Sequence, residues 1–285
     1  MDFFYNFYPN RILFSAFGLS IYWYGFLIFL SVLFSFFVFY KLAKKENIEK
    51  NNIFDIYFYT TLFGLIGARI VYIFYQLGYY ISNPLEILKF WNGGMSIIGG
   101  IMFGSLTLYF ICKKRNINLT KILNILPITL LVAQIIGRFG NYFNQELFGI
   151  PTSFFLKIPI DKINRPTQYS NSEFFTPLFF YEIFFNIILL IILFILLKRK
   201  NKNNLNTGII SKELKLKDFR KQMDSLVFIE KGGILFIYIN YYFILRFILE
   251  FFRINEPKIL FFSVNQALSL VILIAFNLYW FLKKK

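Results

Sequence analysis

The sequence predicts an all-α membrane protein: a bundle of about seven transmembrane helices that forms a single integral membrane domain over residues 1–285. Three observations support this fold class. Of the 285 residues, 57% are hydrophobic and only 16% are charged, a balance that is not typical of soluble domains. Apolar runs recur along the chain at about the 20-residue length that crosses a bilayer. The lysines gather in the segments between these runs.

Each predicted transmembrane run is long enough to cross about 30 Å of hydrocarbon as a helix. The seven runs are Phe17–Tyr40, Ile53–Tyr79, Gly94–Cys112, Ile122–Gly140, Pro177–Leu197, Gly233–Phe252 and Phe262–Leu282. Clusters of lysine and arginine follow the first, third and fifth runs and end the chain. Because cytoplasmic segments are enriched in these residues, the N-terminus is expected outside and the C-terminus in the cytoplasm.

Two longer segments lie outside the predicted runs. Residues 142–176 contain three prolines and are expected to form a small, irregular extracytoplasmic head. Residues 201–232 form a basic cytoplasmic insert, in which Leu216, Phe219, Met223 and Leu226 recur at helical spacing. This spacing fits an amphipathic helix on the anionic inner leaflet. A solvated linker fits the same composition, and both interpretations stay open.

Composition also excludes several function classes. The net charge of +16 comes mostly from the loop lysines, and no basic surface with interleaved aromatics is visible, so nucleic acid is not an expected partner. The chain has one cysteine, Cys112, and no histidine, so neither an intramolecular disulfide nor a Cys/His metal site is expected. We interpret Cys112 as a core or interface residue. The N-terminus lacks the pattern of a cleaved signal peptide, so the first run is expected to stay in the mature protein.

Charged residues within the predicted runs indicate a site. Those on the second, fourth, fifth and sixth runs fall near one level, in the outer half of the bilayer; they are Arg69, Arg138, Glu182, Arg246, Glu250 and Arg253. A charge in hydrocarbon costs about 2.5–3.5 kcal/mol, so such side chains face a paired or wet interior. With Glu146 the set holds four arginines and three glutamates, which suits an anion such as a phospholipid phosphate. Interhelical ion pairs with a purely structural role are the alternative.

Glycines accompany these charges at two places. The segment Gly137–Gly149, GRFGNYFNQELFG, presents an arginine, two asparagines and a glutamate on approachable backbone at the end of the fourth run. The same sequence also fits an ordinary helix C-terminus, with solvated polar side chains and a glycine that ends the helix. Gly99 and Gly100 in the third run clear space either for a ligand or for a neighbouring helix, and the Gly100-x-x-x-Gly104 spacing favours helix packing.

The segment GRFGNYFNQELFG resembles the signature of bacterial prolipoprotein diacylglyceryl transferases. Further matches cover nearly the whole chain: Trp23-Tyr24-Gly25, Gly67-Ala68-Arg69, Trp91 to Gly100, Pro177 to Glu182, Arg246 to Arg253, and Gln266. Seven transmembrane helices with the N-terminus outside also agree with the family.

The resemblance implies an enzyme of the bacterial cytoplasmic (inner) membrane that needs no cofactor and no metal. It would transfer the diacylglyceryl group of phosphatidylglycerol to the lipobox cysteine of a preprolipoprotein and release glycerol 1-phosphate; its partners would be these substrates and the surrounding membrane lipids. Arg138 and Arg246 would hold the phosphate. Asn141, Asn144, Glu146 and Gly149 would complete the outer site, and Tyr24 would lie near the reacting atoms. Arg69, Glu182, Glu250 and Arg253 would order the arginines.

The chain departs from the family at two positions. Ile98 and Thr176 stand where the family commonly has histidines, so an imidazole cannot take the thiol proton. We expect Glu146, Tyr24 or water to accept that proton instead; a slow or non-catalytic, lipid-binding relative is one alternative. A transporter or flippase for an anionic lipid or solute is another, although such a path needs charges in both halves of the bilayer. Here the inner half holds little charge beyond Asp55.

Overall fold

The computed structural model describes residues 7–16, 19–90, 93–206, 232–254, 258–259 and 261–282. The amphipathic pattern of the cytoplasmic insert, Trp91 of the third-run motif and the three C-terminal lysines lie outside the described residues.

Across the described ranges, seven helices are long and apolar enough to cross a membrane, which confirms the predicted fold class. They are α2 (Trp23–Lys45), α3 (Lys50–Tyr75), α5 (Ile97–Lys114), α6 (Leu119–Asn144), α7 (Leu178–Asn206), α9 (Gly233–Leu249) and α10 (Val264–Leu282). The shorter helices are α4 (Leu77–Ser82), η1 (Pro84–Leu88), η3 (Lys162–Asn164), η4 (Thr167–Tyr169) and η5 (Glu250–Phe252). The strands are β1 (Ile12–Ala16), β2 (Leu19–Tyr22), β3 (Ile158–Pro159), β4 (Phe174–Phe175), β5 (Lys258–Ile259) and β6 (Phe262–Ser263).

The first helix begins later than predicted. Residues from Phe17 were expected to start it, but β1 and β2 pair as an antiparallel hairpin, and α2 begins only at Trp23. The Ser15 and Ser20 hydroxyls, which lie opposite each other in this hairpin, are 2.9 Å apart and share a hydrogen bond. A short apolar run fits a strand as well as a helix, so hydropathy alone placed this boundary wrongly.

The sixth predicted run, Gly233–Phe252, is confirmed, but its last turn is tighter than an α-helix: α9 ends at Leu249 and continues as η5. The i, i+4, i+7 spacing of Arg246, Glu250 and Arg253 in the sequence predicts one face of a continuous helix, but the helix stops before Arg253. Arg253 itself is extended, with φ −82° and ψ 147°. Its backbone forms an isolated antiparallel bridge with Gly149, and this pairing competes with a further helical turn.

Two compact units divide the chain, a larger one of Met1–Ser35 and Leu126–Lys285 and a smaller one of Phe36–Ile125. In the smaller unit α3 packs against α5 through glycines. A Cβ atom on Gly99 would overlap the Gly67 carbonyl, and one on Gly100 would lie 3.6 Å from the Gly64 carbonyl oxygen. This close approach of two backbones is the packing that small residues permit in membranes.

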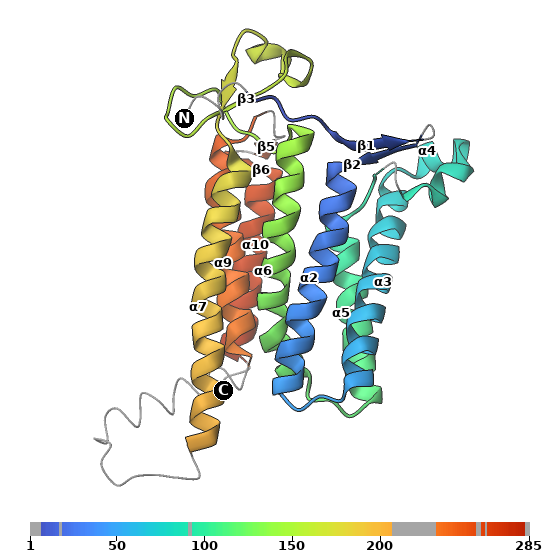
Figure 1. The fold of residues 1–285 in the computed structure, drawn as a ribbon, viewed down its shortest axis with the longest axis vertical. Helices are drawn as coiled ribbons and strands as arrows, with labels where there is room; N and C mark the ends of the chain where they lie inside the picture. Colours follow the sequence, from blue (N-terminus) through green and yellow to red (C-terminus); the bar gives the residue numbers. More distant parts are fainter. Residues whose placement is uncertain are drawn as a thin grey trace. The chain divides into compact units, whose positions relative to one another are not determined.

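In the larger unit α6, α7, α9 and α10 lie side by side (Figure 1). The segment between α6 and α7 forms a small head, in which β3 pairs with β4. Side chains such as Leu193 are fully buried between the helices, whereas Ile191 is 55% exposed. Large apolar side chains on the outside of a helix bundle suit a lipid environment rather than water.

Candidate functional site

The end of α6 folds back on itself and returns Glu146 to the helix. The Glu146 N–H donates to the Asn141 carbonyl at 3.0 Å, and the Gln145 N–H donates to the Tyr142 carbonyl at 3.1 Å. These two bonds, with Gln145 in the left-handed region at φ 51°, form a Schellman motif. The Asn141 Nδ2 then donates to the Glu146 carboxylate at 2.8 Å. The motif therefore brings an acidic side chain over the last turn of α6.

Gln145 occupies a position where glycine is usual, and its side chain explains why. The Gln145 side chain is buried, and its amide nitrogen donates to the Asp161 carboxylate. Its amide oxygen accepts from the Asp161 N–H at 2.7 Å and from the Asn164 Nδ2 at 3.1 Å. These bonds fix the end of α6 to the head and offset the strain of a positive φ. The sequence did not single out Gln145, because its role depends on partners about 16 to 19 residues away.

A chain of ion pairs joins α6, α7, α9 and η5. Glu182, on α7, is 5% exposed and uses both carboxylate oxygens: Oε2 pairs with Arg138 Nε of α6, and Oε1 accepts from Arg246 Nη1 of α9 at 2.9 Å. Arg138 Nη1 also donates to Asn141 Oδ1 at 3.3 Å. Two guanidinium groups from different helices are thus held beside one buried carboxylate.

Glu250 continues this chain at the end of α9. Its carboxylate is buried and lies 3.9 Å from Arg246 Nη2 and 3.5 Å from Arg253 Nη1. Asn265 Nδ2 donates to Glu250 Oε1 at 2.8 Å, so the first turn of α10 also holds this carboxylate. The larger unit therefore places Arg138, Arg246 and Arg253 with Glu146, Glu182 and Glu250 in one connected group.

Gly149 closes the segment 137–149 against the end of the sixth helix. Its N–H donates to the Thr176 carbonyl at 2.8 Å, and its backbone bridges Arg253. A Cβ atom at this position would lie 2.5 Å from the Phe252 carbonyl oxygen. Gly149 thus supplies close backbone contact, and this contact fixes Arg253 relative to the end of α6.

Tyr24 lies over the glycine of the last turn of α6. A Cβ atom on Gly140 would lie 2.7 Å from Tyr24 Cδ2, so the ring fits only because residue 140 has no side chain. Tyr24 is 38% exposed and close enough to Glu146 and Arg138 to interact with both charges. The sequence predicted Tyr24 near the reacting atoms, and its role there stays a prediction.

A cavity of about 360 Å³ opens beside Glu146 and Arg253. Arg11, Asn144 and Asn164 also line it. Arg11 Nη2 donates to Asn164 Oδ1 at 2.6 Å and to the Asn144 carbonyl at 3.2 Å. The sequence analysis did not identify Arg11 as a site residue, because nothing in the sequence indicated that residues before the first helix return to the end of α6.

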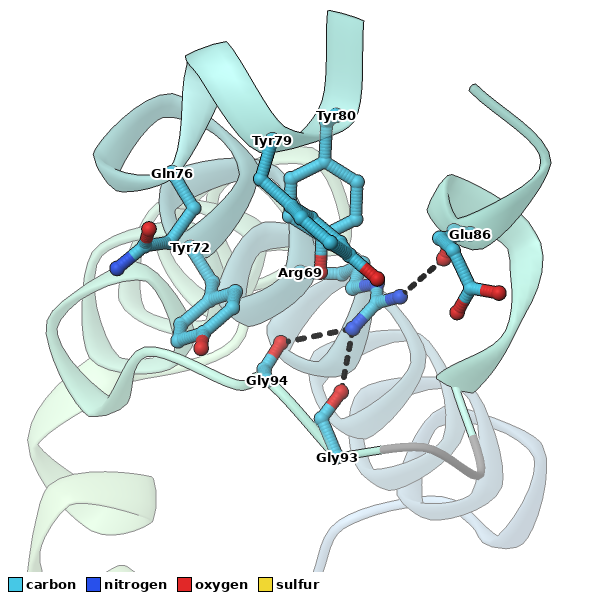
Figure 2. Close-up of a pocket in the computed structure, with 8 residues that line it drawn as sticks. All are labelled: Arg69, Tyr72, Gln76, Tyr79, Tyr80, Glu86, Gly93 and Gly94. Carbon is cyan, nitrogen blue, oxygen red and sulfur yellow. Dashed lines mark hydrogen bonds between the residues drawn. The ribbon is translucent and has the colours of Figure 1, made fainter. Parts of the chain in front are cut away.

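Arg69 does not share these partners. It lies in the smaller unit, is 3% exposed, and directs its guanidinium at backbone carbonyls (Figure 2). Nε donates to Ile87, Nη1 to Gly93 and Gly94, and Nη2 to Glu86 and Lys89. All five N–H groups of the guanidinium are therefore occupied.

The neighbourhood of Arg69 supports a structural role for this side chain. The Tyr80 and Phe90 rings lie 5.3 and 5.5 Å from its Cζ atom. A cavity of about 370 Å³ adjoins it, lined by Tyr72, Tyr79, Gln76 and others (Figure 2). Arg69 clamps the segment between α4 and α5, and the prediction that it orders the other arginines is not supported by these partners. Without Arg69, the connected group holds three arginines and three glutamates, so it lacks the one-arginine excess that was expected from the sequence. Arg11, which lines the cavity beside Glu146 and Arg253, places a further positive charge next to the group.

Gly99 and Gly100 were expected either to clear space for a ligand or to pack against a helix. In the structure both face α3, where their missing side chains allow contact with the backbone of Gly64 and Gly67. This geometry favours the packing interpretation. Their proposed part in substrate binding stays a prediction without a contact that supports it.

Comparison with known proteins decides the family. The family model described as prolipoprotein diacylglyceryl transferase matches residues 11–212 and 217–282. The chain belongs to the prolipoprotein diacylglyceryl transferase family. A phosphatidylglycerol–prolipoprotein diacylglyceryl transferase of Finegoldia magna is 34% identical over 266 residues, which cover 93% of this chain and 92% of that protein. One of Lactobacillus acidophilus is 30% identical over 279 residues, 97% of this chain and 90% of that protein.

A third relative of the same name, from Staphylococcus aureus, is 36% identical over 182 residues, 63% of this chain and 65% of that protein. The seven apolar helices and the membership of this transferase family together identify a multi-pass membrane protein. At the two positions where histidines were expected, this family member has Ile98, which is 47% exposed, and Thr176, whose hydroxyl donates to the Ile150 carbonyl at 2.9 Å.

Proposed function

We propose that the chain transfers the diacylglyceryl group of phosphatidylglycerol to the lipobox cysteine of a preprolipoprotein, in the bacterial cytoplasmic membrane with its N-terminus outside. One observation carries the proposal: Arg138 and Arg246, from two helices, converge on the two oxygens of Glu182. Their side chains stay 24% and 21% exposed, so neither is fully covered by protein, and we infer that their remaining donors bind the phosphate.

In the proposed reaction the cysteine sulfur attacks the glyceryl carbon that bears the phosphate. A carbon–sulfur bond forms, the carbon–oxygen bond breaks, and glycerol 1-phosphate leaves with the electron pair. Negative charge grows on the leaving phosphate, and fixed guanidinium groups stabilise this charge more in the transition state than in the ground state. Glu182 and Glu250 hold the guanidinium groups in place, so little reorganisation is needed during the reaction.

The remaining site residues are assigned to binding the glycerol head group of the lipid and to accepting the proton of the cysteine thiol. The cavity beside Glu146, with Asn144, Asn164 and Arg11 on its walls, suits the hydroxyls of the glycerol head group. Asn141 connects Glu146 to Arg138. We assign Glu146, Tyr24 or a water molecule near the arginines as acceptor of the thiol proton, since no histidine is present. A thiol with a pKa near 8.5 is a few per cent ionised at neutral pH, so modest base assistance is sufficient.

The test uses purified protein in vesicles of phosphatidylglycerol with a lipobox peptide. Wild type should form the thioether lipid and release glycerol phosphate in equal amounts. Arg138→Ala and Arg246→Ala should each lower kcat about 10²- to 10³-fold, the usual effect of removing a preorganised donor to developing charge.

Arg115→Ala is the matched control, because Arg115 pairs with Asp55 at 2.8 Å in the smaller unit. Its activity should equal that of wild type. Wild-type protein that binds phosphatidylglycerol but releases no glycerol phosphate would contradict the proposal and indicate a non-catalytic relative.

A further inference from the structure

The cavity beside Glu146 and Arg253 offers hydrogen-bond donors that the proposed transfer step does not use. Arg11 lines this cavity and is exposed, and its Nη2 donates to the Asn144 carbonyl and to Asn164 Oδ1. Within the described ranges, neither Nη1 nor Nε of Arg11 has a partner, and no carboxylate pairs with the guanidinium. Three of its five N–H groups are therefore available to a ligand in the cavity.

The cavity beside Arg69 is a useful comparison, because it has a similar volume and also adjoins an arginine (Figure 2). There all five N–H groups of the guanidinium bond backbone carbonyls. An anion in that cavity would find no donor left on Arg69. Of these two cavities, only the one at Arg11 thus combines room for a ligand with unused guanidinium donors.

Arg253 brings a second guanidinium group to the same cavity. Its Nη1 lies 3.5 Å from the Glu250 carboxylate, and its side chain is 25% exposed. The Glu250 carboxylate also lies 3.9 Å from Arg246 Nη2. One wall of the cavity is therefore connected, through a single carboxylate, to an arginine that is proposed to hold the lipid phosphate.

Glu146 connects the cavity to the other proposed phosphate ligand. Its Oε1 accepts from Asn141 Nδ2 at 2.8 Å and from Asn144 Nδ2 at 3.4 Å. Asn141 Oδ1 in turn accepts from Arg138 Nη1 at 3.3 Å. The cavity thus adjoins the proposed transfer site through both Arg138 and Arg246.

The cavity lies on the head side of the helices, since Asn164 belongs to η3 of the head and Asn144 ends α6 (Figure 1). Its volume of about 360 Å³ is within the range of small-molecule sites, about 300–1,000 Å³. Two guanidinium groups suit a phosphate, whereas the Glu146 carboxylate and the asparagine side chains suit hydroxyls. A small molecule that carries both a phosphate and hydroxyls fits this set of groups.

The proposed reaction releases such a molecule. The lipid phosphodiester carries a single negative charge, whereas the phosphate monoester of glycerol carries about 1.5 to 2 at neutral pH. Once the carbon–oxygen bond breaks, this phosphate is no longer attached to the acyl chains and can move outward to Arg11. Because charge-assisted hydrogen bonds are about twice as strong as neutral ones, Arg11 stabilises the freed phosphate more than the uncharged glycerol of the intact lipid.

We propose that this cavity binds glycerol 1-phosphate after transfer, with Arg11 and Arg253 on the phosphate and Glu146 and the asparagines on the hydroxyls. This inference rests on the proposed function, because the ligand is the product of that reaction. Product and lipid head group cannot occupy the cavity together. Glycerol 1-phosphate in the outer medium therefore competes with phosphatidylglycerol and slows the enzyme.

The experiment measures transfer to a lipobox peptide in phosphatidylglycerol vesicles with added glycerol 1-phosphate, inorganic phosphate or glycerol. Glycerol 1-phosphate should inhibit wild type competitively, inorganic phosphate should inhibit less, and glycerol should not inhibit. Arg11→Gln keeps a donor for Asn164 but loses the charge. It should raise Ki for glycerol 1-phosphate about tenfold and KM for the lipid only about threefold, the effects of a charged and of a neutral hydrogen bond.

Two further variants separate charge from structure. Arg11→Lys retains the positive charge and should keep Ki within about threefold of wild type. Arg115→Gln is the matched control, since this arginine pairs with Asp55 in the smaller unit, and it should change neither Ki nor KM. An equal rise of Ki and KM in Arg11→Gln would indicate a structural role for Arg11 and overturn the inference. Equal inhibition by inorganic phosphate and glycerol 1-phosphate would overturn the glycerol contacts.

Direct binding of labelled glycerol 1-phosphate in detergent, without lipid or peptide, distinguishes this inference from the proposed function. Protein that binds the label in an Arg11-dependent manner but transfers no lipid contradicts the proposed function and supports the cavity site. Protein that transfers lipid but neither binds the label nor is inhibited by it overturns the inference and leaves the proposed function in place.

Discussion

Glu182→Gln tests the centre of the ion-pair chain with almost no change in side-chain shape. Glutamine keeps one oxygen that can accept from Arg138 or Arg246. Its amide nitrogen then faces the other guanidinium, and because both groups are hydrogen-bond donors they cannot bond to each other. The connected group of three arginines and three glutamates changes from neutral to one excess positive charge. The substitution thus removes the restraint on two guanidinium groups without removing either of them.

The expected cost in stability follows from burial. The Glu182 side chain is 7% exposed, and those of its two arginine partners are 24% and 21% exposed, so solvent screening is limited. Removing one partner of a buried ion pair costs about 3–5 kcal/mol. The retained oxygen and the partly exposed arginines place the expected loss near the lower end, at about 3 kcal/mol.

The effect on catalysis should separate kcat from KM. Misplacement of the guanidinium groups by about 1 Å is expected to lower kcat about 10²-fold. Lipid binding should not weaken, because the site gains positive charge toward an anionic head group. Asp55→Asn is the control, since it removes an interhelical ion pair of the smaller unit that is more exposed.

The assay measures initial transfer rates over a range of phosphatidylglycerol concentrations in mixed micelles, together with the thermal midpoint of each purified variant. A raised KM with unchanged kcat in Glu182→Gln would refute the reasoning, because Glu182 would then contribute to lipid binding. An unchanged thermal midpoint in Glu182→Gln would refute the argument that Glu182 is a buried, charged carboxylate that stabilises the fold.

Two further substitutions test single positions. Arg69→Lys should lower the thermal midpoint, because lysine has three donors for five carbonyl partners and cannot match their planar arrangement; an unchanged midpoint would argue against the clamp. Gly149→Ala should lower kcat and stability together, because its Cβ would lie 2.5 Å from the Phe252 carbonyl and displace Arg253. Gly78→Ala is the control, since its Cβ would meet no atom within 4 Å, and a loss of activity there equal to that of Gly149→Ala would count against the explanation.

The sequence by itself determined the fold class, the number of spanning helices and the family. Apolar length is a property of consecutive residues, so seven runs were visible without any tertiary contact. The rarity of charge in such runs also made Arg138, Glu182 and Arg246 conspicuous, because a charge at membrane depth needs a partner whatever the fold.

Tertiary structure alone decided which of these charges meet. Arg69 lies in a run of the same kind as the others, yet its five donors bond the carbonyls of a segment about 20 residues further along the chain. Gln145 and Arg11 drew no attention in the sequence, since a common polar residue acquires a role only through partners brought close by folding. Hydropathy is additive along a chain, whereas hydrogen bonds depend on angle and distance between distant segments, and only the folded chain sets those.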